Sequence, residues 1–274
     1  MTIKIKGSGN NVTKFRGKTI IGSPTSYVGD GTESEQPVSG AKFNGTGQAI
    51  AVSNDSDFNF NGSSWTIEFF AKNASTTSMS TLWTMYASTS LYAGLRHNAT
   101  SNGLCAYKHH WGEFLSVGST FTLNSSQSIK TSTWKHVALC YDSSDYTLRT
   151  YLNGDKLSIE TTNINIGNWS YLTTSNNFTY FSIGAAVDGT NTIVNESDVE
   201  ISNFRFVVGT ALYTDPTSIT VPSSNLTAIT NTKLLLFNGQ GTLTQDQSGT
   251  GGPGGTGKTV TNFGSVTSVT GPFG

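Results

Sequence analysis

WKHVALCYDSSDYTLRTYLNG, residues 134–154, contains two strand patterns together with the turns that end them. Residues 134–141 alternate with a period of two and are rich in side chains that favour β-structure. The polar segment 142–145 reads as a turn, and residues 148–152 alternate in the same way. Asn153-Gly154 follows, a dipeptide that tolerates the two positive φ angles of a type I′ hairpin. The stretch therefore predicts antiparallel β-sheet built from successive strands.

Similar short runs occur on both sides of this stretch, separated by segments rich in Gly and Asn. We expect strands at 18–21, 48–52, 65–71, 80–86, 91–97, 104–109, 178–184, 199–208 and 233–237. No amphipathic helix of ten residues or more is visible in the pattern. Many short strands between turn residues predict an all-β sandwich or barrel.

Composition narrows the classes of partner. Charged residues make up 12% of the 274 residues and the net charge is −1, against roughly 25% charged residues in an average soluble domain. Lys and Arg are scattered, so neither nucleic acid nor an anionic membrane is an expected partner. The start, MTIKIKGSGNNVTKF, lacks the apolar core of a signal peptide, and we expect synthesis in a cytoplasm. Cys105 and Cys140 are expected to be buried free thiols.

Three segments of the chain differ in residue composition and in strand pattern. Residues 1–40 begin with a weak alternating pattern and continue through a stretch rich in Gly, Ser and Glu, which predicts an extended N-terminal arm. Residues 41–240 carry almost all of the strand patterns and are expected to form one sandwich domain. Residues 241–274 are expected to add a Gly-rich loop and a closing C-terminal strand to the same domain.

Several motifs, in this order along the chain, resemble those of laminin G-like, concanavalin A-like domains, in the version found in virion proteins of tailed phages, especially marine ones. The motifs are FNG at 43–45, WTIEFF at 65–70, WKHVA at 134–138, YLNG at 151–154, SIG at 182–184, ISNFR at 201–205 and GTALY at 209–213. The closing segments at 232–236, 262–266 and 271–273 are also similar. Residues 1–40 lie outside the resemblance, and Asp198 to Glu200 depart from it because many relatives have a Gly-containing step there.

The resemblance implies a jelly-roll sandwich of two antiparallel sheets in a non-enzymatic protein of a phage virion surface. It also implies that His136 is a structural residue of its strand. The arm would then attach the protein to other virion proteins of the capsid or tail, and a homo-oligomer is expected because such assemblies are symmetric. The outward loops would either bind a host carbohydrate or only decorate the particle.

The densest aromatic and imidazole cluster is the carbohydrate-binding candidate. It comprises Tyr107, His109, His110 and Trp111. Aromatic faces stack on the apolar face of a pyranose, and imidazoles can bond its hydroxyl groups. The alternative is a strand, a turn and a second strand in which the aromatic rings are simply packed. His109 and His110 point to opposite faces of a strand, so the two are not expected to share a metal ion.

The string Glu196, Asp198, Glu200 offers an enzymatic alternative. It resembles the catalytic strand of a group of jelly-roll glycoside hydrolases, in which the first Glu is the nucleophile and the last is the acid/base. Three carboxylates spaced by two would share one face of a strand. Exposed carboxylates on a loop that enters a strand are the simpler interpretation, because no aromatic cleft can be placed around them.

Two further patterns concern bound cofactors. Asp55, Asp57 and Asn59 could supply oxygen ligands to Ca²⁺, although the rest of an EF-hand template is absent. Gly252, Gly257, Lys258 and Thr259 match the spacing of a Walker A string. The flanking segments lack the preceding strand and following helix that a P-loop needs. We therefore interpret the Walker string as a coincidence of composition and expect no nucleotide and no resident cofactor.

Overall fold

A computed structural model describes residues 12–15, 18–21, 37–58, 62–75, 80–88, 91–98, 103–110, 113–117, 128–157, 161–162, 178–249 and 257–274. The chain divides into two compact units, residues 1–36 and 37–274. In the first unit, β1 (Val12–Phe15) pairs antiparallel with β2 (Lys18–Ile21), so the strand predicted at 18–21 is confirmed. The second unit contains all other described strands.

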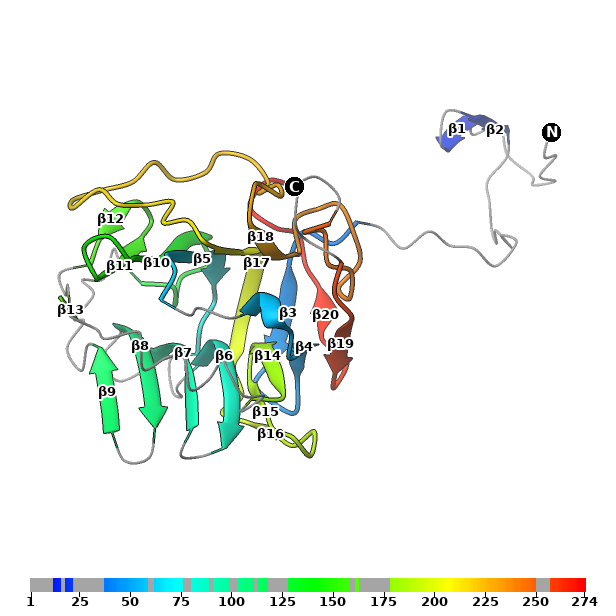
Figure 1. The fold of residues 1–274 in the computed structure, drawn as a ribbon. Helices are drawn as coiled ribbons and strands as arrows, with labels where there is room; N and C mark the ends of the chain where they lie inside the picture. Colours follow the sequence, from blue (N-terminus) through cyan, green and yellow to red (C-terminus); the bar gives the residue numbers. More distant parts are fainter. Residues whose placement is uncertain are drawn as a thin grey trace. The chain divides into compact units, whose positions relative to one another are not determined.

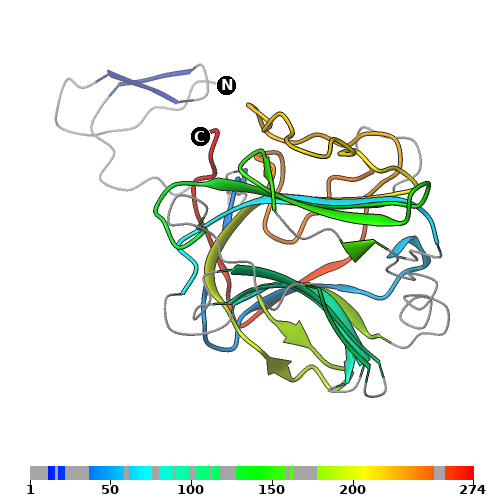
Figure 2. The same cartoon turned by 90° about the vertical axis from the view of Figure 1, so that its left-hand side faces the viewer.

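Two antiparallel sheets make up the second unit. The nine-stranded sheet has the order β12-β11-β10-β5-β17-β3-β20, with β13 added to β11 and β18 added to β17. Figure 2 shows it stacked over the second sheet. Its strands are β3 (Ala41–Asn44), β5 (Trp65–Lys72), β10 (Lys135–Asp142), β11 (Thr147–Leu152), β12 (Asp155–Lys156), β13 (Thr161–Thr162), β17 (Asp198–Val208), β18 (Thr232–Leu236) and β20 (Thr267–Ser268).

The seven-stranded sheet has the order β19-β4-β14-β6-β7-β8-β9 (Figure 1). Its strands are β4 (Ala49–Ser53), β6 (Ser80–Ser88), β7 (Leu91–Asn98), β8 (Gly103–His110), β9 (Glu113–Val117), β14 (Tyr180–Ile183) and β19 (Val260–Phe263). The strand patterns of the sequence are thus confirmed to within a few residues, as is the all-β sandwich of two antiparallel sheets.

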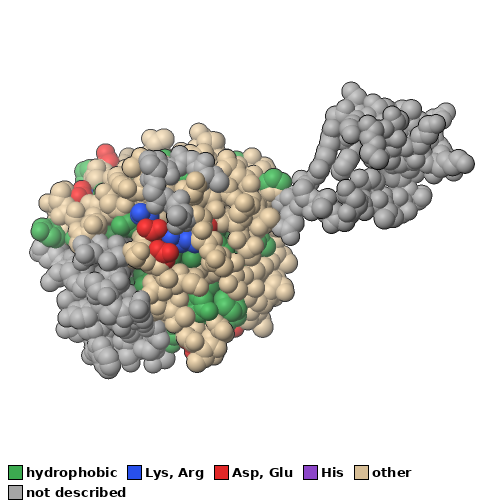
Figure 3. All heavy atoms as spheres, turned by 45° about the vertical axis from the view of Figure 1, so that its right-hand side comes forward, with side chains coloured by type: hydrophobic (Ala, Val, Ile, Leu, Met, Phe, Trp, Pro, Cys, Tyr) green, Lys and Arg blue, Asp and Glu red, His purple; other side chains and the backbone are tan. Residues whose placement is uncertain are grey.

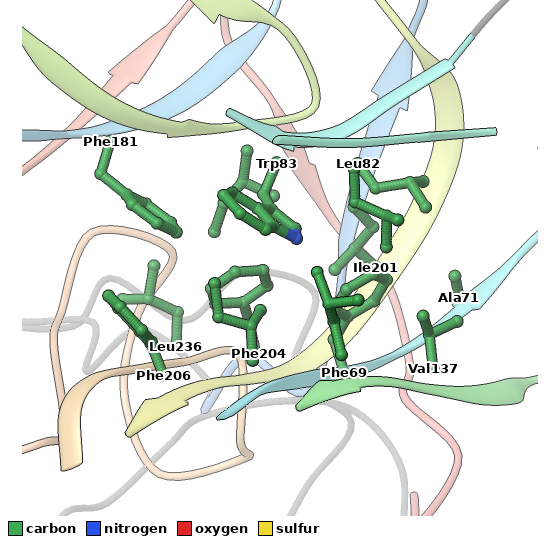
Figure 4. Packing of buried hydrophobic residues seen from close by; sticks show 14 of the residues in the cluster. Phe69, Ala71, Leu82, Trp83, Val137, Phe181, Ile201, Phe204, Phe206 and Leu236 are labelled. Carbon is green, nitrogen blue, oxygen red and sulfur yellow. The ribbon is translucent and has the colours of Figure 1, made fainter. Parts of the chain in front are cut away.

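The core lies between the sheets and is dominated by stacked aromatic rings. Phe181 of β14 stacks on Trp83 of β6 and on Phe206 of β17, with ring centroids 5.6 Å apart in both pairs. Figure 4 shows these rings in contact across the two layers, together with Phe69 and Phe204. Alternation explains the arrangement, because every second residue of each strand points into the layer between the sheets.

The hairpin predicted at the end of residues 134–154 is present. Strands β11 and β12 pair through Leu152 and Asp155, so Asn153 and Gly154 form a two-residue turn. Their φ angles are 52° and 95°, as a type I′ turn requires. Within the described residues the one helical segment is the 3₁₀ turn η1 (Ser56–Phe58), and no helix there is long and apolar enough to cross a membrane.

The C-terminal residues connect the two sheets. Strand β19 pairs with β4 at the edge of the seven-stranded sheet, and β20 pairs with β3 in the nine-stranded sheet. Gly271 then donates its backbone N–H to the Ser39 hydroxyl at 2.9 Å, and the Phe273 ring packs edge-on against Phe70. The last residues therefore hold the segment around Ser39, where the chain enters the sandwich, in place.

Each sheet also has an outer face that points away from the core. On the seven-stranded sheet, part of this face is covered by the hairpin β15 (Ala186–Val187) and β16 (Ile193–Val194), which packs on Ala49 and Ala51 of β4. On the nine-stranded sheet, the long loop 209–231 supplies cover through hydrogen bonds to strand side chains. The candidate sites lie on these outer faces.

Candidate functional site

A row of aromatic residues crosses the seven-stranded sheet from β14 to β9. By strand register, the row consists of Tyr180, Tyr86, Tyr92, His109 and Phe114, each directly opposite the next. Residues directly opposite one another in antiparallel strands lie on the same face of a sheet. The adjacent row along the strands contains the opposed pair Met85 and Ala93, and it belongs to the hydrophobic core on the other face of the sheet. The aromatic row therefore occupies the outer face.

The next outer row on the same sheet carries small and polar residues with one further aromatic. It runs Ser182, Thr84, Gly94, Tyr107 and Ser116 across the same five strands. Gly94 stands between Thr84 and Tyr107, where any other residue would place a side chain on this face. The two rows together give a surface of aromatic and uncharged polar positions. We call this surface, made of these two rows, the aromatic face.

Local contacts fix the β14 end of the aromatic face. The Tyr180 hydroxyl donates to Oδ1 of Asn191 at 2.7 Å, and its ring packs edge-on against Phe263 with centroids 5.8 Å apart. The Thr84 hydroxyl donates to the backbone carbonyl of Ala93 at 2.9 Å. Tyr180 is partly exposed, whereas Tyr86 is almost fully buried although it belongs to neither hydrophobic cluster. Near β14, β6 and β7 the described residues of the face are therefore mostly buried, and Tyr180 is the partly exposed one among Tyr180, Ser182, Thr84, Tyr86 and Gly94.

The carbohydrate candidates of the sequence divide between the two faces of β8. Tyr107 and His109 hold positions on the aromatic face, whereas His110 pairs with Leu91 and Glu113 in a row of the opposite face. Trp111 lies outside the described residues. The sequence did not single out Tyr86, Tyr92 or Tyr180, because which strands are neighbours is decided by topology.

The three carboxylates of the hydrolase alternative are not equivalent. Glu196 precedes β17 and accepts a hydrogen bond from the backbone N–H of Gly47 at 2.8 Å. Asp198 is exposed at the first position of the strand. Glu200 is nearly buried, lies 3.1 Å from the Lys72 ammonium group and accepts a hydrogen bond from the Asn73 amide at 3.0 Å. Two of the three carboxylates are therefore occupied by groups of the protein itself.

The calcium candidates Asp55 and Asp57 face two ammonium groups. Asp57 lies 2.7 Å from Lys258 Nζ and 3.1 Å from Lys233 Nζ, and Asp55 lies 3.5 Å from Lys258 Nζ. Burial raises the pKa of Asp57, but the hydrogen bonds from both lysines outweigh it and leave this pKa below its ordinary value. A cation would have to displace both lysines. Asn59 lies outside the described residues, which contain no metal-ligand cluster of His, Cys, Asp and Glu.

The lysine of the Walker string is the one that binds Asp57. Lys258 is almost completely buried and lies over the Phe58 ring, 5.4 Å from its centroid. Thr259 follows it directly before β19, Gly257 precedes it, and Gly252 lies outside the described residues. Figure 3 shows one side of the molecule, where acidic and basic side chains adjoin on an otherwise mostly uncharged surface. Lys258 thus completes an ion-pair cluster with Asp55, Asp57 and Lys233. Its ammonium group is directed at these carboxylates and not at a phosphate site.

The nine-stranded sheet carries a buried charge that the sequence analysis missed. Glu68 of β5 is fully buried on the outer face and accepts hydrogen bonds from three side chains. They are His136 Nε2 at 3.0 Å, Tyr213 Oη at 2.7 Å and Arg205 Nε at 2.9 Å. We call these four residues the Glu68 network. The sequence did contain a signal for this network. Each of two largely apolar strand patterns holds one charged residue, Glu68 in WTIEFF and Arg205 in ISNFRF, and the two charges have opposite signs.

The network keeps Glu68 ionised. Burial would raise its pKa, but the hydrogen bond from His136 and the positive charge of Arg205 more than compensate, so the pKa lies below its ordinary value. The pKa of Tyr213 is raised by burial and by the adjacent Glu68 carboxylate, so its phenol keeps its proton. A carboxylate with three donors has little capacity to accept a proton from a substrate. The network therefore joins strand side chains to one another, and His136 is one of its buried members.

The same network fastens loop 209–231 over the sheet. Tyr213 belongs to this loop, and Arg205 also donates to the Thr227 carbonyl at 2.9 Å. Thr66 donates to the Thr210 carbonyl at 3.2 Å and accepts the backbone N–H of Leu212 at 3.0 Å. Cys140 lies beside it as a buried free thiol, 3.3 Å from the Thr66 hydroxyl, and burial raises the pKa of that thiol. The loop is therefore held at many points along its length.

No protein-family model and no curated protein matches the sequence. Solved structures match it in part, at low identity and with TM-scores below 0.5. A SAP-like pentraxin from Limulus polyphemus matches with 12% identity over 65% of this chain and 78% of that chain, with a TM-score of 0.41. The Ruminococcus gnavus IT-sialidase CBM40 matches with 10% identity over 64% and 93%, at 0.45. Domain 4 of AbnA, a GH43 extracellular arabinanase from Geobacillus stearothermophilus, matches with 14% identity over 64% and 72%, at 0.41.

Proposed function

We propose that this chain is a non-enzymatic β-sandwich protein of a tailed-phage virion surface and that it binds saccharides at the aromatic face. The observation that carries the saccharide proposal is the continuous row of Tyr180, Tyr86, Tyr92, His109 and Phe114 across five strands. The support is that these five positions are successive Cα partners across the sheet, although they come from segments up to 94 residues apart in the chain.

The chemistry of the aromatic face suits a sugar chain. A pyranose has an apolar face that stacks on aromatic rings and a rim of hydroxyl groups that needs uncharged donors and acceptors. In the second row, the Ser182 and Thr84 side chains are fully buried and donate to the Ala185 and Ala93 carbonyls, so the rings of the first row would make the contact with the sugar. Adjacent strands are about 4.8 Å apart, so three or four strands match the length of two to three linked sugar rings.

The virion role rests on different support. The motif order along residues 41–274 resembles phage virion modules, and residues 1–36 form a compact unit separate from the sandwich. A separate N-terminal unit is what attachment to a capsid or tail protein would use.

A glycan array carrying bacterial surface polysaccharides tests the saccharide proposal. The full chain should bind at least one glycan, and Tyr92→Ala should weaken that binding at least tenfold. Tyr146→Ala is the matched control, since Tyr146 is an exposed tyrosine in the β10–β11 turn of the other sheet. Binding lost in Trp111→Ala but retained in Tyr92→Ala would move the site to the loop. A chain that binds no glycan would overturn the proposal.

Two other assays test the remaining parts. Deletion of residues 1–36 should abolish incorporation into virions, and unchanged incorporation would contradict the role of the arm. Reducing-sugar release from a bound glycan should be absent in the full chain. Release that disappears in Glu196→Gln would instead support the hydrolase alternative with Glu196, Asp198 and Glu200.

A further inference from the structure

Two partly exposed aromatic rings meet beside the β14 end of the aromatic face. Tyr180 of β14 and Phe263 of β19 pack edge-on, with ring centroids 5.8 Å apart. Both rings pack against the outer-face cluster that contains Ala49 and Ala51 of β4, and these alanines are fully buried. The two rings themselves are only partly buried. Part of each ring is therefore accessible from outside, on a base that fixes its position.

The loop 188–192 between β15 and β16 reaches this ring pair. The Tyr180 hydroxyl donates to Oδ1 of Asn191 at 2.7 Å. Oδ1 of Asp188 accepts the Thr190 hydroxyl at 2.7 Å and the backbone N–H groups of Thr190 and Thr192 at 2.8 Å. Among the described residues, no group bonds to Oδ2 of Asp188 or to Nδ2 of Asn191. The loop therefore presents one acceptor and one donor near the rings.

This combination of groups suits a sugar. A pyranose stacks its apolar face on an aromatic ring, and each of its hydroxyl groups can donate and accept hydrogen bonds. A carboxylate oxygen accepts from one hydroxyl, and an amide N–H donates to another. Asn191 is exposed and Asp188 is partly exposed, so both groups can be reached without a change in the fold.

We propose that Asp188 and Asn191 form the polar part of a saccharide subsite, that Tyr180 and Phe263 form its apolar part, and that the subsite takes a neutral sugar unit. This inference rests on the proposed saccharide binding, and it names the end of the aromatic face at which the sugar is recognised. Three separate segments supply the groups, β14, the loop 188–192 and β19.

The charge of Asp188 is the reason for a neutral sugar. Hydrogen bonds from the Thr190 hydroxyl and the Thr192 N–H hold the pKa of Asp188 below its ordinary value, so this group is a carboxylate at neutral pH. It forms no ion pair with a described residue. A carboxylate or sulfate on the sugar would meet a like charge at the subsite, whereas a neutral hydroxyl would form a charge-assisted hydrogen bond.

The glycan array of bacterial surface polysaccharides tests the subsite with three variants of the full chain. Asp188→Asn keeps an Oδ1 acceptor for the turn but replaces the free Oδ2 with an amide N–H, and it should weaken binding about tenfold or more. Asn191→Asp, which removes the donor, and Phe263→Leu, which removes the ring, should also weaken binding. Asp215→Asn is the matched control and should bind as wild type does, because Oδ1 of Asp215 also accepts two backbone N–H groups and one hydroxyl, in a loop over the other sheet.

Calorimetry with two probes that differ only in charge tests the choice of a neutral sugar. The probes are an oligogalacturonate and its methyl ester. The ester should bind about tenfold or more tighter than the acid, and Asp188→Asn should reduce this difference because it removes the negative charge of the subsite. If neither probe binds, the array decides, since binding confined to anionic glycans overturns the neutral class and binding of neutral glycans supports it.

The outcomes separate this inference from the proposed function. Glycan binding that Asp188→Asn and Phe263→Leu leave unchanged overturns the subsite and leaves saccharide binding intact. An acid probe that binds as tightly as its ester overturns the neutral class. If no saccharide of any charge binds, the proposed function fails as well. Unfolding midpoints measured for every variant distinguish a lost site from a lost fold.

Discussion

The imidazole Nε2 of His136 lies 3.0 Å from Oε2 of Glu68, and both side chains are fully buried. His136 belongs to β10 and Glu68 to β5, and Arg205 of β17 holds the other oxygen of the same carboxylate. One carboxylate therefore joins three adjacent strands of the nine-stranded sheet and the loop above them.

Glu68→Gln should destabilise the sandwich by about 3–5 kcal/mol, because it leaves the Arg205 charge buried without its partner. Denaturant unfolding at neutral pH measures this change. Glu200→Gln is the control, since it removes a carboxylate that faces Lys72 nearer the surface. A loss from Glu68→Gln no larger than that from Glu200→Gln would contradict the account.

Acid should weaken the contribution of Glu68. Its pKa in the folded protein lies below the ordinary value of 4.5, so the unfolded chain binds its proton more readily than the folded one. The stabilisation is therefore complete above the unfolded pKa and is lost as pH falls through the lower folded pKa. The difference in unfolding free energy between wild type and Glu68→Gln should narrow as pH falls below about 4.5. A difference that widens in acid would contradict this assignment.

Tyr213→Phe should loosen loop 209–231 while the strands stay paired. The change removes one donor to Glu68 and should cost about 1–3 kcal/mol. Hydrogen exchange is the appropriate readout, because the Leu212 amide is bonded to the Thr66 hydroxyl and the Ile219 amide to the Gly154 carbonyl. Both amides should exchange faster. Tyr180→Phe, which removes a hydroxyl bonded to Asn191, should leave them unchanged.

The sequence predicted the strands well because alternation records which side of each strand is buried. It predicted the Asn153-Gly154 turn because few other dipeptides accept two positive φ angles. It did not predict the Glu68 network, since Glu68, His136, Arg205 and Tyr213 are brought together only by the order β10-β5-β17 and by the return of a loop. Periodicity within one strand contains no information about which strands are neighbours.

Gly184 should tolerate no side chain. Its φ is +83°, and an added Cβ would lie 2.2 Å from a ring carbon of the buried Phe43. Gly184→Ala should therefore cost about 1–3 kcal/mol for the displaced ring and about 1 kcal/mol for the backbone conformation. Gly62→Ala isolates the second effect, because Gly62 has φ +72° and open space around its Cβ position. Similar unfolding free energies for both variants would contradict the close approach to Phe43.

Lys258→Met should destabilise the protein by about 1–3 kcal/mol, because it leaves Asp57 with one ammonium partner in place of two. The unfolding midpoint measures the change, and Lys42→Met at an exposed position is the control. Wild type and Lys258→Met should be equally unable to bind ATP with Mg²⁺. Nucleotide binding by wild type that is lost in the variant would restore the Walker interpretation.

The candidate site shows the same division between local and long-range information. Tyr107 and His109 stood out because they are close in the sequence, and both belong to the aromatic face by register. Tyr86, Tyr92 and Tyr180 lie in separate strands, and each alone is an ordinary strand tyrosine. The calcium pattern at Asp55 and Asp57 has a related limit, because their partners Lys233 and Lys258 come from segments more than 170 residues away.

A crystal structure of the full chain soaked with the glycan that binds best on the array tests the central proposal most directly. The account predicts a sugar ring stacked on the row that contains Tyr92 and His109, on the outer face of the seven-stranded sheet. A sugar bound instead at the turn that contains Tyr146, or over the Glu196 to Glu200 segment, would contradict it.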